Sequence, residues 1–219
     1  MHYGNLQKIR DGKRTFGITP HIPGGFISPD SLEKIAQVAR KYNGVIKITS
    51  GQRILITNLK VENLAEVWKE LDMEPAIETA NSVKNVEICP AGFCKRSKYN
   101  TIGIGMKLLK KYHKMEMPCR TKIGVAGCRN ACGSIYARDV GVIADISGLM
   151  VVAGGSAGYN PRIADVIAIN LNEKEALKLV DIIFDYYKEK AELGEKLSFM
   201  IERLGIDSFK SEVLNRLYK

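Results

Sequence analysis

Five cysteines are the residues of this chain best suited to chemistry, and all of them lie between positions 89 and 132. Cys89 and Cys94 are separated by four residues that include a proline and a glycine, and Cys128 and Cys132 are separated by three. Cysteines that only fill a core scatter through the apolar positions of a chain, whereas metal ligands must converge on one point. The clustering therefore favours ligands over buried structural thiols.

Two pairs of thiolates match the ligand count of a 4Fe–4S cluster or of a structural zinc site. Zinc sites prefer the closer C-x2-C spacing, so the wider spacing favours a cluster held by Cys89, Cys94, Cys128 and Cys132. In a helix, the C-x3-C pair would place its two sulfurs on one face, one turn apart. Because four thiolates already satisfy a cluster, we expect Cys119 to be a buried free thiol rather than a fifth ligand.

The composition indicates a globular protein with an acidic partner, ligand or surface. The chain has 219 residues, 45% of them hydrophobic and 26% charged, which excludes a disordered chain, and its formal net charge is +9. No apolar run approaches the roughly 18 residues that span a bilayer. The first residues, Met1-His2-Tyr3-Gly4-Asn5, lack the apolar core of a signal peptide. We therefore expect a cytoplasmic protein with no membrane association.

Residues 1–80 are expected to form a small α+β unit. Ser28 is a good N-cap and Pro29 suits the first position of a helix. Apolar residues at helical spacing predict helices over 29–42 and 64–71, and β-branched runs predict strands over 15–19, 45–49 and 53–57. The resulting order β-α-β-β-α is typical of a ferredoxin-like half-domain.

Residues 81–219 are expected to form a second domain, in which glycine-rich and cysteine-bearing loops alternate with short apolar strands. The strands are predicted over 123–126, 140–144, 149–153 and 166–169. A strong amphipathic helix is predicted over 171–190, with Asn172 and Glu175 as its capping box, and two shorter helices follow it. The lysine-rich stretch 107–114 is interpreted as solvated surface or as a docking patch for an electron donor.

A glycine- and cysteine-rich segment, Gly127-Cys128-x-Asn130-x-Cys132, follows the basic segment Arg120-Thr121-Lys122-Ile123-Gly124-Val125. Together these segments resemble the signature of the sirohaem and 4Fe–4S nitrite and sulfite reductase family. The segments Ile22-Pro23-Gly24-Gly25, Ile48-Thr49-Ser50-Gly51-Gln52-Arg53 and Val67-Trp68-Lys69-Glu70-Leu71 resemble the half-domain that precedes that signature. The similarity covers about residues 14–190, and the length is similar to that of the small single-repeat sulfite reductases.

The resemblance implies an α+β fold with a ferredoxin-like half-domain (1–80) followed by a sirohaem and iron–sulfur α/β domain (81–219). It implies that the paired cysteines hold a 4Fe–4S cluster and that the thiolate of Cys132 also binds the iron of sirohaem. Asn130 is expected at the cofactors. Gly155 and Arg162, in a glycine-rich loop, are expected near the haem carboxylates, because glycine allows close backbone approach and arginine can pair with a carboxylate. The implied substrate-binding cations are Arg53, Lys84, Arg120 and Lys122.

The resemblance also implies an oxidoreductase that reduces sulfite to sulfide, with the reduction of nitrite to ammonia as the alternative on the same site. Both reactions consume six electrons, so a redox cofactor must carry them while fixed cations hold the oxyanion. An electron donor such as a ferredoxin or another small redox protein is expected, and Lys95-Arg96-Ser97-Lys98 is a candidate docking surface. Because larger members carry two repeats, the pocket of this chain is expected to be completed either within one chain or across a homodimer.

Two alternatives from other classes stay open at this stage. A haem-free protein with a 4Fe–4S cluster would be an electron carrier or a redox sensor on the same fold. A zinc-stabilised RNA-binding protein would also explain the positive charge and the cysteines. An aromatic content of only 7% and the lack of a recognisable nucleic-acid module disfavour this last interpretation, so no nucleic-acid partner is expected.

Overall fold

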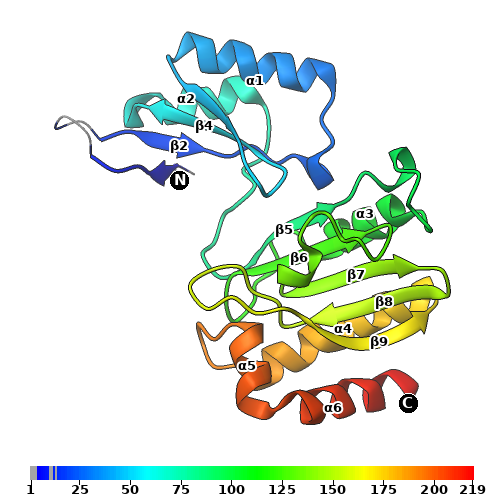
Figure 1. Ribbon diagram of the computed structural model, residues 1–219. Helices are drawn as coiled ribbons and strands as arrows, with labels where there is room; N and C mark the ends of the chain where they lie inside the picture. The colour runs from blue at the N-terminus through cyan, green and yellow to red at the C-terminus, as the bar shows by residue number, and fades with distance from the viewer. Residues whose placement is uncertain (1–3, 10–11, 13) are drawn as a thin grey trace. The chain divides into compact units, whose positions relative to one another are not determined.

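The computed structural model of the protein describes residues 4–9, 12 and 14–219 (Figure 1). Met1–Tyr3, which belong to the start of the chain considered above, lie outside the described residues. The chain divides into two compact units, Met1–Glu78 and Thr79–Lys219. No helix in the described part of the chain is both long enough and apolar enough to cross a membrane.

The first unit is an antiparallel sheet with two helices packed on it. Its strands are β1 (Asn5–Leu6), β2 (Phe16–Ile18), β3 (Val45–Ile48) and β4 (Ile54–Leu59), in the order β1-β2-β4-β3. Its helices are α1 (Pro29–Lys41) and α2 (Leu64–Leu71). The hydroxyl of Ser28 accepts a hydrogen bond from the N–H of Ser31 at 3.1 Å, so the predicted N-cap of α1 is confirmed.

The second unit is built on a five-stranded mixed sheet. Its strands are β5 (Val83–Ile88), β6 (Thr121–Ala126), β7 (Val140–Asp145), β8 (Gly148–Ala153) and β9 (Asp165–Leu171), which lie in chain order across the sheet. The first three strands are parallel and the last two join as an antiparallel meander. The helices are α3 (Thr101–Tyr112), α4 (Glu173–Lys190), α5 (Leu197–Leu204) and α6 (Ile206–Tyr218).

The two faces of this sheet are covered differently. All four helices contribute buried side chains to the core on one face. The other face is covered by the segment after β6, which includes a short 3-10 turn, η4 (Ile135–Ala137). Ile135 lies on Gly124 and Gly141, where an added Cβ would come within 2.7 and 2.6 Å of its side chain. These two glycines therefore let the cysteine-bearing segment lie flat on the sheet.

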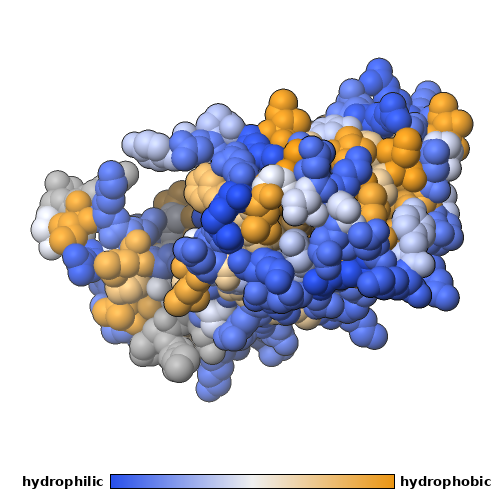
Figure 2. All heavy atoms as spheres, turned by 90° about the horizontal axis from the view of Figure 1, so that it is seen from below, coloured by the Kyte–Doolittle hydropathy of each residue, from blue (hydrophilic) through white to orange (hydrophobic). Residues whose placement is uncertain are grey.

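The predicted capping box of α4 is confirmed. The side chain of Asn172 accepts from the N–H of Glu175 at 3.0 Å, and the Glu175 carboxylate accepts from the N–H of Asn172 at 2.9 Å. The strand β5 and the helix α3 were not predicted, and α3 includes much of the lysine-rich stretch. Figure 2, which looks from the side where α6 lies in Figure 1, shows a mostly hydrophilic surface with hydrophobic residues scattered among charged ones.

Candidate active site

The two cysteine pairs lie in loops that leave the sheet at the same edge. Cys89 follows β5 directly, and its N–H donates to the carbonyl of Val125 at 2.9 Å, which continues the ladder between β5 and β6. Cys128 lies two residues beyond the end of β6. Because β5 and β6 are parallel neighbours, with Ile88 opposite Val125, their carboxyl ends meet at one edge. Ligands of open α/β sheets bind at this end of the strands.

Gly127 joins the two cysteine loops. Its N–H donates to the Sγ atom of Cys89 at 3.2 Å, and its carbonyl accepts from the N–H of Lys98 at 2.7 Å. A Cβ at this position would come within 2.5 Å of the Oγ atom of Ser97, so only glycine lets the loops approach this closely. The glycine before Cys128 is therefore a packing requirement of the paired loops.

The segment from Cys128 to Cys132 is a series of turns rather than a helix, so the C-x3-C pair does not lie on a helix face. Ala131 and Ser134 have φ angles of 44° and 56°, in the left-handed region. The Nδ2 atom of Asn130 donates to the Sγ atom of Cys132 at 2.9 Å. Asn130 was predicted to lie at the cofactors. In the structure its side chain contacts Cys132, the cysteine that the resemblance assigns to both cofactors.

The chemistry of these donors fits an iron–sulfur cluster. All five cysteines are free thiols, with Cys94 and Cys132 exposed and Cys89 and Cys128 half-buried. In the described ranges, no three His, Cys, Asp or Glu side chains are grouped as a single metal ion would need, and a multi-iron cluster holds its thiolates farther apart than one ion does. Amide and N–H donors to sulfur tune such clusters. Because Cys132 is exposed, a second group can reach its sulfur.

Cys119 lies apart from the two loops, before the start of β6. It is half-buried rather than fully buried as predicted, because it belongs to the connection that enters β6 from the surface. The hydroxyl of Thr121 donates to its carbonyl at 2.9 Å.

A cavity of about 370 Å³ lies beside the second cysteine pair. It is lined by Cys128 and by four cations, Lys95, Arg96, Lys98 and Arg129. Arg129 forms an ion pair of 2.6 Å with Asp145, at the end of β7. The loops that carry the cysteines therefore present a positively charged surface.

A second cavity, of about 240 Å³, lies at the opposite end of β6 and β7. We call it the basic cavity, and its charged lining residues are Arg120, Lys122, Arg138, Asp139 and Lys196. Gly155 and Ser156, which follow β8, complete one wall, and the Nζ atom of Lys196 lies 3.4 Å from the Oγ atom of Ser156. The predicted substrate residues Arg120 and Lys122 thus share one cavity with the predicted cofactor residue Gly155.

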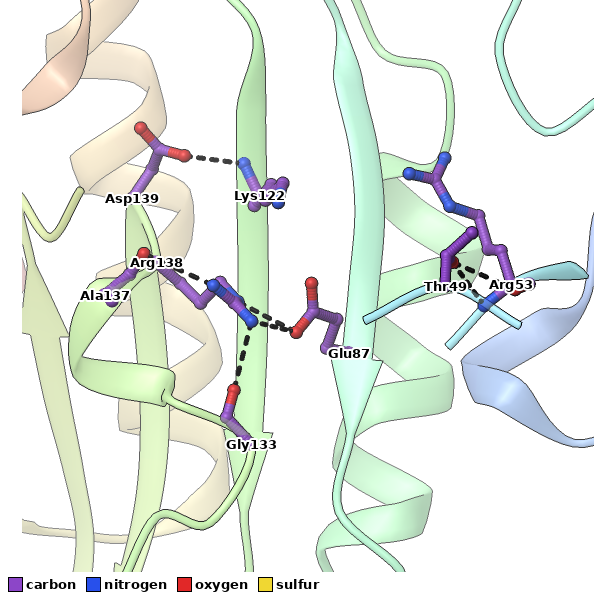
Figure 3. Close-up of polar contacts among 8 residues, drawn as sticks. All are labelled: Thr49, Arg53, Glu87, Lys122, Gly133, Ala137, Arg138 and Asp139. Atoms are coloured by element: carbon purple, nitrogen blue, oxygen red, sulfur yellow. Dashed lines mark hydrogen bonds and ion pairs between the residues drawn. The ribbon is translucent and has the colours of Figure 1, made fainter. Parts of the chain in front are cut away.

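Asp139 is the carboxylate of the basic cavity. Its Oδ2 atom accepts a hydrogen bond from the backbone N–H of Lys122 at 2.8 Å (Figure 3). Burial raises the pKa of Asp139 to about 6, although the Lys122 N–H and the charges of Lys196 and Lys122 act in the opposite direction. A carboxyl with such a pKa exchanges its proton near neutral pH.

The other predicted site residues have partners within their own unit. Lys84 is buried on β5, and its ammonium donates to the carbonyl of Thr79. Arg53 lies in the first unit at the end of the turn from β3 to β4, where its N–H and carbonyl bond to the hydroxyl of Thr49 at 3.2 and 2.9 Å (Figure 3).

The glycine-rich loop after β8 is held tightly by the rest of the second unit. Arg162 forms ion pairs with Asp165 at 2.5 Å and Glu202 at 3.2 Å, and it donates to the carbonyl of Gly154 at 2.9 Å. A Cβ on Gly155 would come within 2.3 Å of a backbone oxygen. Both residues therefore have a structural role in this loop, and their contact with a haem stays a prediction.

The resemblance named the cysteines, Asn130, Arg120 and Lys122 as site residues, but it did not name Asp139, Ser156 and Lys196, which line the basic cavity. These three residues come from three separate segments, and no motif joins them. The one available signal for Asp139 was its position directly before an apolar strand.

Comparison with known families agrees with this geometry. The "Nitrite and sulphite reductase 4Fe-4S domain" family matches residues 79–219, and the "Nitrite/Sulfite reductase ferredoxin-like half domain" family matches residues 7–74. The expected fold class, a ferredoxin-like half-domain followed by a cluster-binding domain, is confirmed.

Individual relatives support the same assignment. The chain is 33% identical over 208 residues to an assimilatory-type sulfite reductase of Nitratidesulfovibrio vulgaris, covering 94% of this chain and 95% of that protein. It is 30% identical over 218 residues to the large subunit of the Escherichia coli NADH nitrite reductase, covering 96% of this chain and 25% of that subunit. A crystal structure of dissimilatory sulfite reductase I superimposes with a TM-score of 0.79 at 14% identity, covering 91% of this chain and 69% of that one.

Both family matches and the relative from Nitratidesulfovibrio vulgaris indicate the same family, and the paired cysteine loops of the second unit can supply thiolates for the cluster of that family. The chain belongs to the nitrite and sulfite reductase family and is an oxidoreductase whose cofactors are a 4Fe–4S cluster and sirohaem.

Proposed function

We propose that this protein reduces sulfite to sulfide, with nitrite as the second candidate substrate. The observation that carries the choice is coverage: the chain spans nearly all of the assimilatory-type sulfite reductase but only a quarter of the nitrite reductase subunit. The chain is therefore similar to a complete small sulfite reductase and to one part of a larger nitrite reductase.

We propose that one set of residues holds the electron-transferring cofactors and that another set binds the oxyanion. Cys89, Cys94, Cys128 and Cys132 would hold the cluster, and Cys132 would share its thiolate with the sirohaem iron. When bound, these cofactors supply the electrons one at a time. Arg120 and Lys122 would hold the oxyanion and stabilise the negative charge that builds up as it is reduced. Arg53 and Lys84 are proposed as further cations, and Gly155 and Arg162 as neighbours of the haem carboxylates.

The principal experiment is an anaerobic spectrum of the purified protein, followed by turnover driven by methyl viologen with sulfite and with nitrite. We expect haem bands, iron and acid-labile sulfide, and a higher kcat/KM for sulfite. A higher kcat/KM for nitrite would favour the second substrate. A protein with cluster but no haem bands would be an electron carrier or sensor, and zinc without iron would revive the RNA-binding alternative.

We further propose that the oxyanion site is completed across a homodimer. Lys122 lies at the start of β6 and Cys128 lies beyond its end, and the two cavities share no lining residue. A six-residue strand is roughly 20 Å long. This separation within one unit supports a site that joins the basic cavity of one copy to the cysteine loops of another.

Complementation tests the shared site. Chains with Lys122→Ala and chains with Cys132→Ser are each expected to be inactive, and mixed dimers are expected to recover up to a quarter to a half of the activity. Mixed dimers without recovery, or a monomer at assay concentrations by sedimentation, would show that each chain contains its own site.

The surface around Cys128 supports an acidic redox protein, such as a ferredoxin, as the electron donor. Lys95, Arg96, Lys98 and Arg129 gather there, and electrostatic attraction between complementary surfaces speeds association. Charge reversal by Lys95→Glu with Lys98→Glu should raise the KM for such a donor and weaken its salt dependence, while methyl viologen turnover stays unchanged. Because free thiols and an iron–sulfur cluster suit a reducing compartment, we expect a cytoplasmic location.

A further inference from the structure

The basic cavity contains one feature that binding an anion does not by itself explain. Among the described residues that line it, Asp139 is a carboxylate in the midst of four cations, Arg120, Lys122, Arg138 and Lys196. A negative carboxylate beside a bound oxyanion would repel it. If the cavity served only to attract anions, an acid at this position would weaken it.

The carboxyl of Asp139 is held in place by the backbone. Its Oδ2 atom accepts from the N–H of Lys122 (Figure 3), its own backbone N–H also acts on the carboxyl, and the residue lines the cavity. The charged and titratable groups that act on it are Lys196 before α5, Lys122 on β6 and Tyr187 on α4, and Arg120 and Arg138 line the same cavity. Burial is the main cause of the raised pKa of Tyr187, and the charge of Asp139 adds to it; the Tyr187 hydroxyl donates to the carbonyl of Glu195 at 2.6 Å.

Burial dominates these influences and raises the pKa of Asp139 to about 6 despite its cationic neighbours. An anion bound between Arg120 and Lys122 adds negative charge beside the carboxyl, and a nearby like charge favours its protonated form further. Binding of an oxyanion therefore draws a proton onto Asp139 near neutral pH.

We propose that Asp139 takes up a proton when an oxyanion binds in the basic cavity and donates that proton to an oxygen of the anion. The inference rests on the proposed function, because Arg120 and Lys122 must hold the anion. It names a residue for the delivery of protons, a role that the proposed function gives to no particular side chain.

The proton balance is simple. The O–H bond of Asp139 breaks, an O–H bond forms on the anion oxygen, and Asp139 is left as a carboxylate that solvent reprotonates. Each oxygen that leaves as water takes two protons and two electrons, and the electrons come singly from the redox partner of the reductase through its cofactors. Asp139 supplies one of the two protons at each departure and solvent supplies the other.

Sulfate binding to the protein at pH 5 to 8 tests the inference without turnover, because sulfate keeps its double charge over this range. By calorimetry in buffers of different ionisation enthalpy, the wild-type protein should take up about one proton per sulfate at pH 7. Its affinity should fall by up to about tenfold per pH unit above pH 6. Asp139→Asn, whose amide oxygen can still accept from the Lys122 N–H, should take up no proton and bind sulfate with a flat pH profile.

Asp207→Asn serves as the matched control, because Asp207 is exposed on α6 and away from the cavity. It should behave as the wild-type protein. Equal proton uptake by the wild-type and Asp139→Asn proteins would overturn the inference, and so would a wild-type protein that takes up no proton or binds no sulfate. If the Asp139→Asn chain does not fold, Asp139→Ser repeats the comparison, and a wild-type protein that takes up no proton overturns the inference in either case.

Turnover separates this inference from the proposed function. With methyl viologen and sulfite, Asp139→Asn should lose a hundredfold or more in kcat, about the range of general acid catalysis, while its cofactor spectrum stays the same. A wild-type protein that reduces neither anion but binds sulfate with proton uptake would refute the reductase assignment and keep the cavity. Full activity in Asp139→Asn would refute the proton donor and keep the reductase.

Discussion

Arg138 and Glu87 form a buried ion pair that joins the two cysteine-bearing segments. The Nε and Nη2 atoms of Arg138 donate to Oε2 of Glu87 at 2.8 and 2.5 Å, and the two side chains are 10% and 3% exposed (Figure 3). Glu87 lies on β5, two residues before Cys89, and Arg138 also donates to the carbonyl of Gly133, next to Cys132, at 3.2 Å. The pair therefore holds the second cysteine loop against the strand that carries the first.

Replacing Arg138 by methionine should destabilise the protein by about 3–5 kcal/mol, because Glu87 is then left as a buried charge without its partner. Oε1 of Glu87 already has no hydrogen-bond partner among the described residues, so the carboxylate has no alternative support there. Urea unfolding measures the loss. Because the cysteine loops would also be released from each other, we expect less iron bound per chain.

A surface pair provides the control for this prediction. Lys190 lies 2.8 Å from Glu189 and both side chains are 45% exposed, so Lys190→Met should leave the free energy of unfolding nearly unchanged. The double variant Glu87→Met with Arg138→Met removes both charges and should recover most of the stability lost in Arg138→Met. A double variant no more stable than the single one would mean that packing, not the orphaned charge, causes the loss.

Asn130 should tune the reduction potential of the cluster. Its amide donates to Cys132 at 2.9 Å, and a hydrogen bond to a ligating sulfur stabilises the more negative, reduced cluster. Asn130→Ala should lower the potential by on the order of tens of millivolts, measured in a redox titration followed by electron paramagnetic resonance. Asn215→Ala, at an exposed position on α6, should leave it unchanged. An unchanged potential in Asn130→Ala would show that the bond is not kept in the loaded protein.

Serine substitutions should separate the ligand cysteines from the remaining one. Replacing any one of the four paired cysteines by serine should remove most of the iron and acid-labile sulfide from the protein, because a cluster needs all four thiolates. Cys119→Ser should keep the full content, since Cys119 lies outside the two loops that Gly127 joins. Loss of the cluster in Cys119→Ser, together with its retention in one of the other four variants, would reassign the ligand set.

The elements predicted correctly are those whose signal is local. The helix α4 carries its own capping box, and β3, β4, β7 and β8 are runs rich in β-branched and apolar residues. The strand β5 was missed because half of it is polar, yet Lys84, Asn85 and Glu87 are all buried there. Glu87 is tolerated only because Arg138, 51 residues later, pairs with it. The two residues meet only in the folded protein, so a strand prediction from the residues around Glu87 cannot take Arg138 into account.

The helix α3 was missed for a related reason. It contains Gly103 and Gly105, which lower helix propensity, and its N-cap Asn100 makes no side-chain capping hydrogen bond. Gly105 is needed because α3 lies close to β5, where a Cβ would come within 2.6 Å of Ile88. The cysteine motif could be predicted from the sequence because its residues lie within 44 positions of one another, whereas the basic cavity takes Lys122, Asp139 and Lys196 from distant segments.

Asp139 should make the stability of the protein depend on pH in a direction opposite to that of a salt-bridged acid. Its folded pKa, about 6, is above the value of about 4 expected for an unfolded chain, so the folded state holds the proton more tightly. Stability from this group is present below about pH 4 and is lost as the pH rises to about 6. Asp139→Asn removes this dependence, so its unfolding free energy relative to wild type should rise between pH 4 and 6 and stay constant from 6 to 8. Chemical unfolding at each pH measures the difference, Asp207→Asn is the control, and a difference that does not change with pH would mean that Asp139 is ionised throughout.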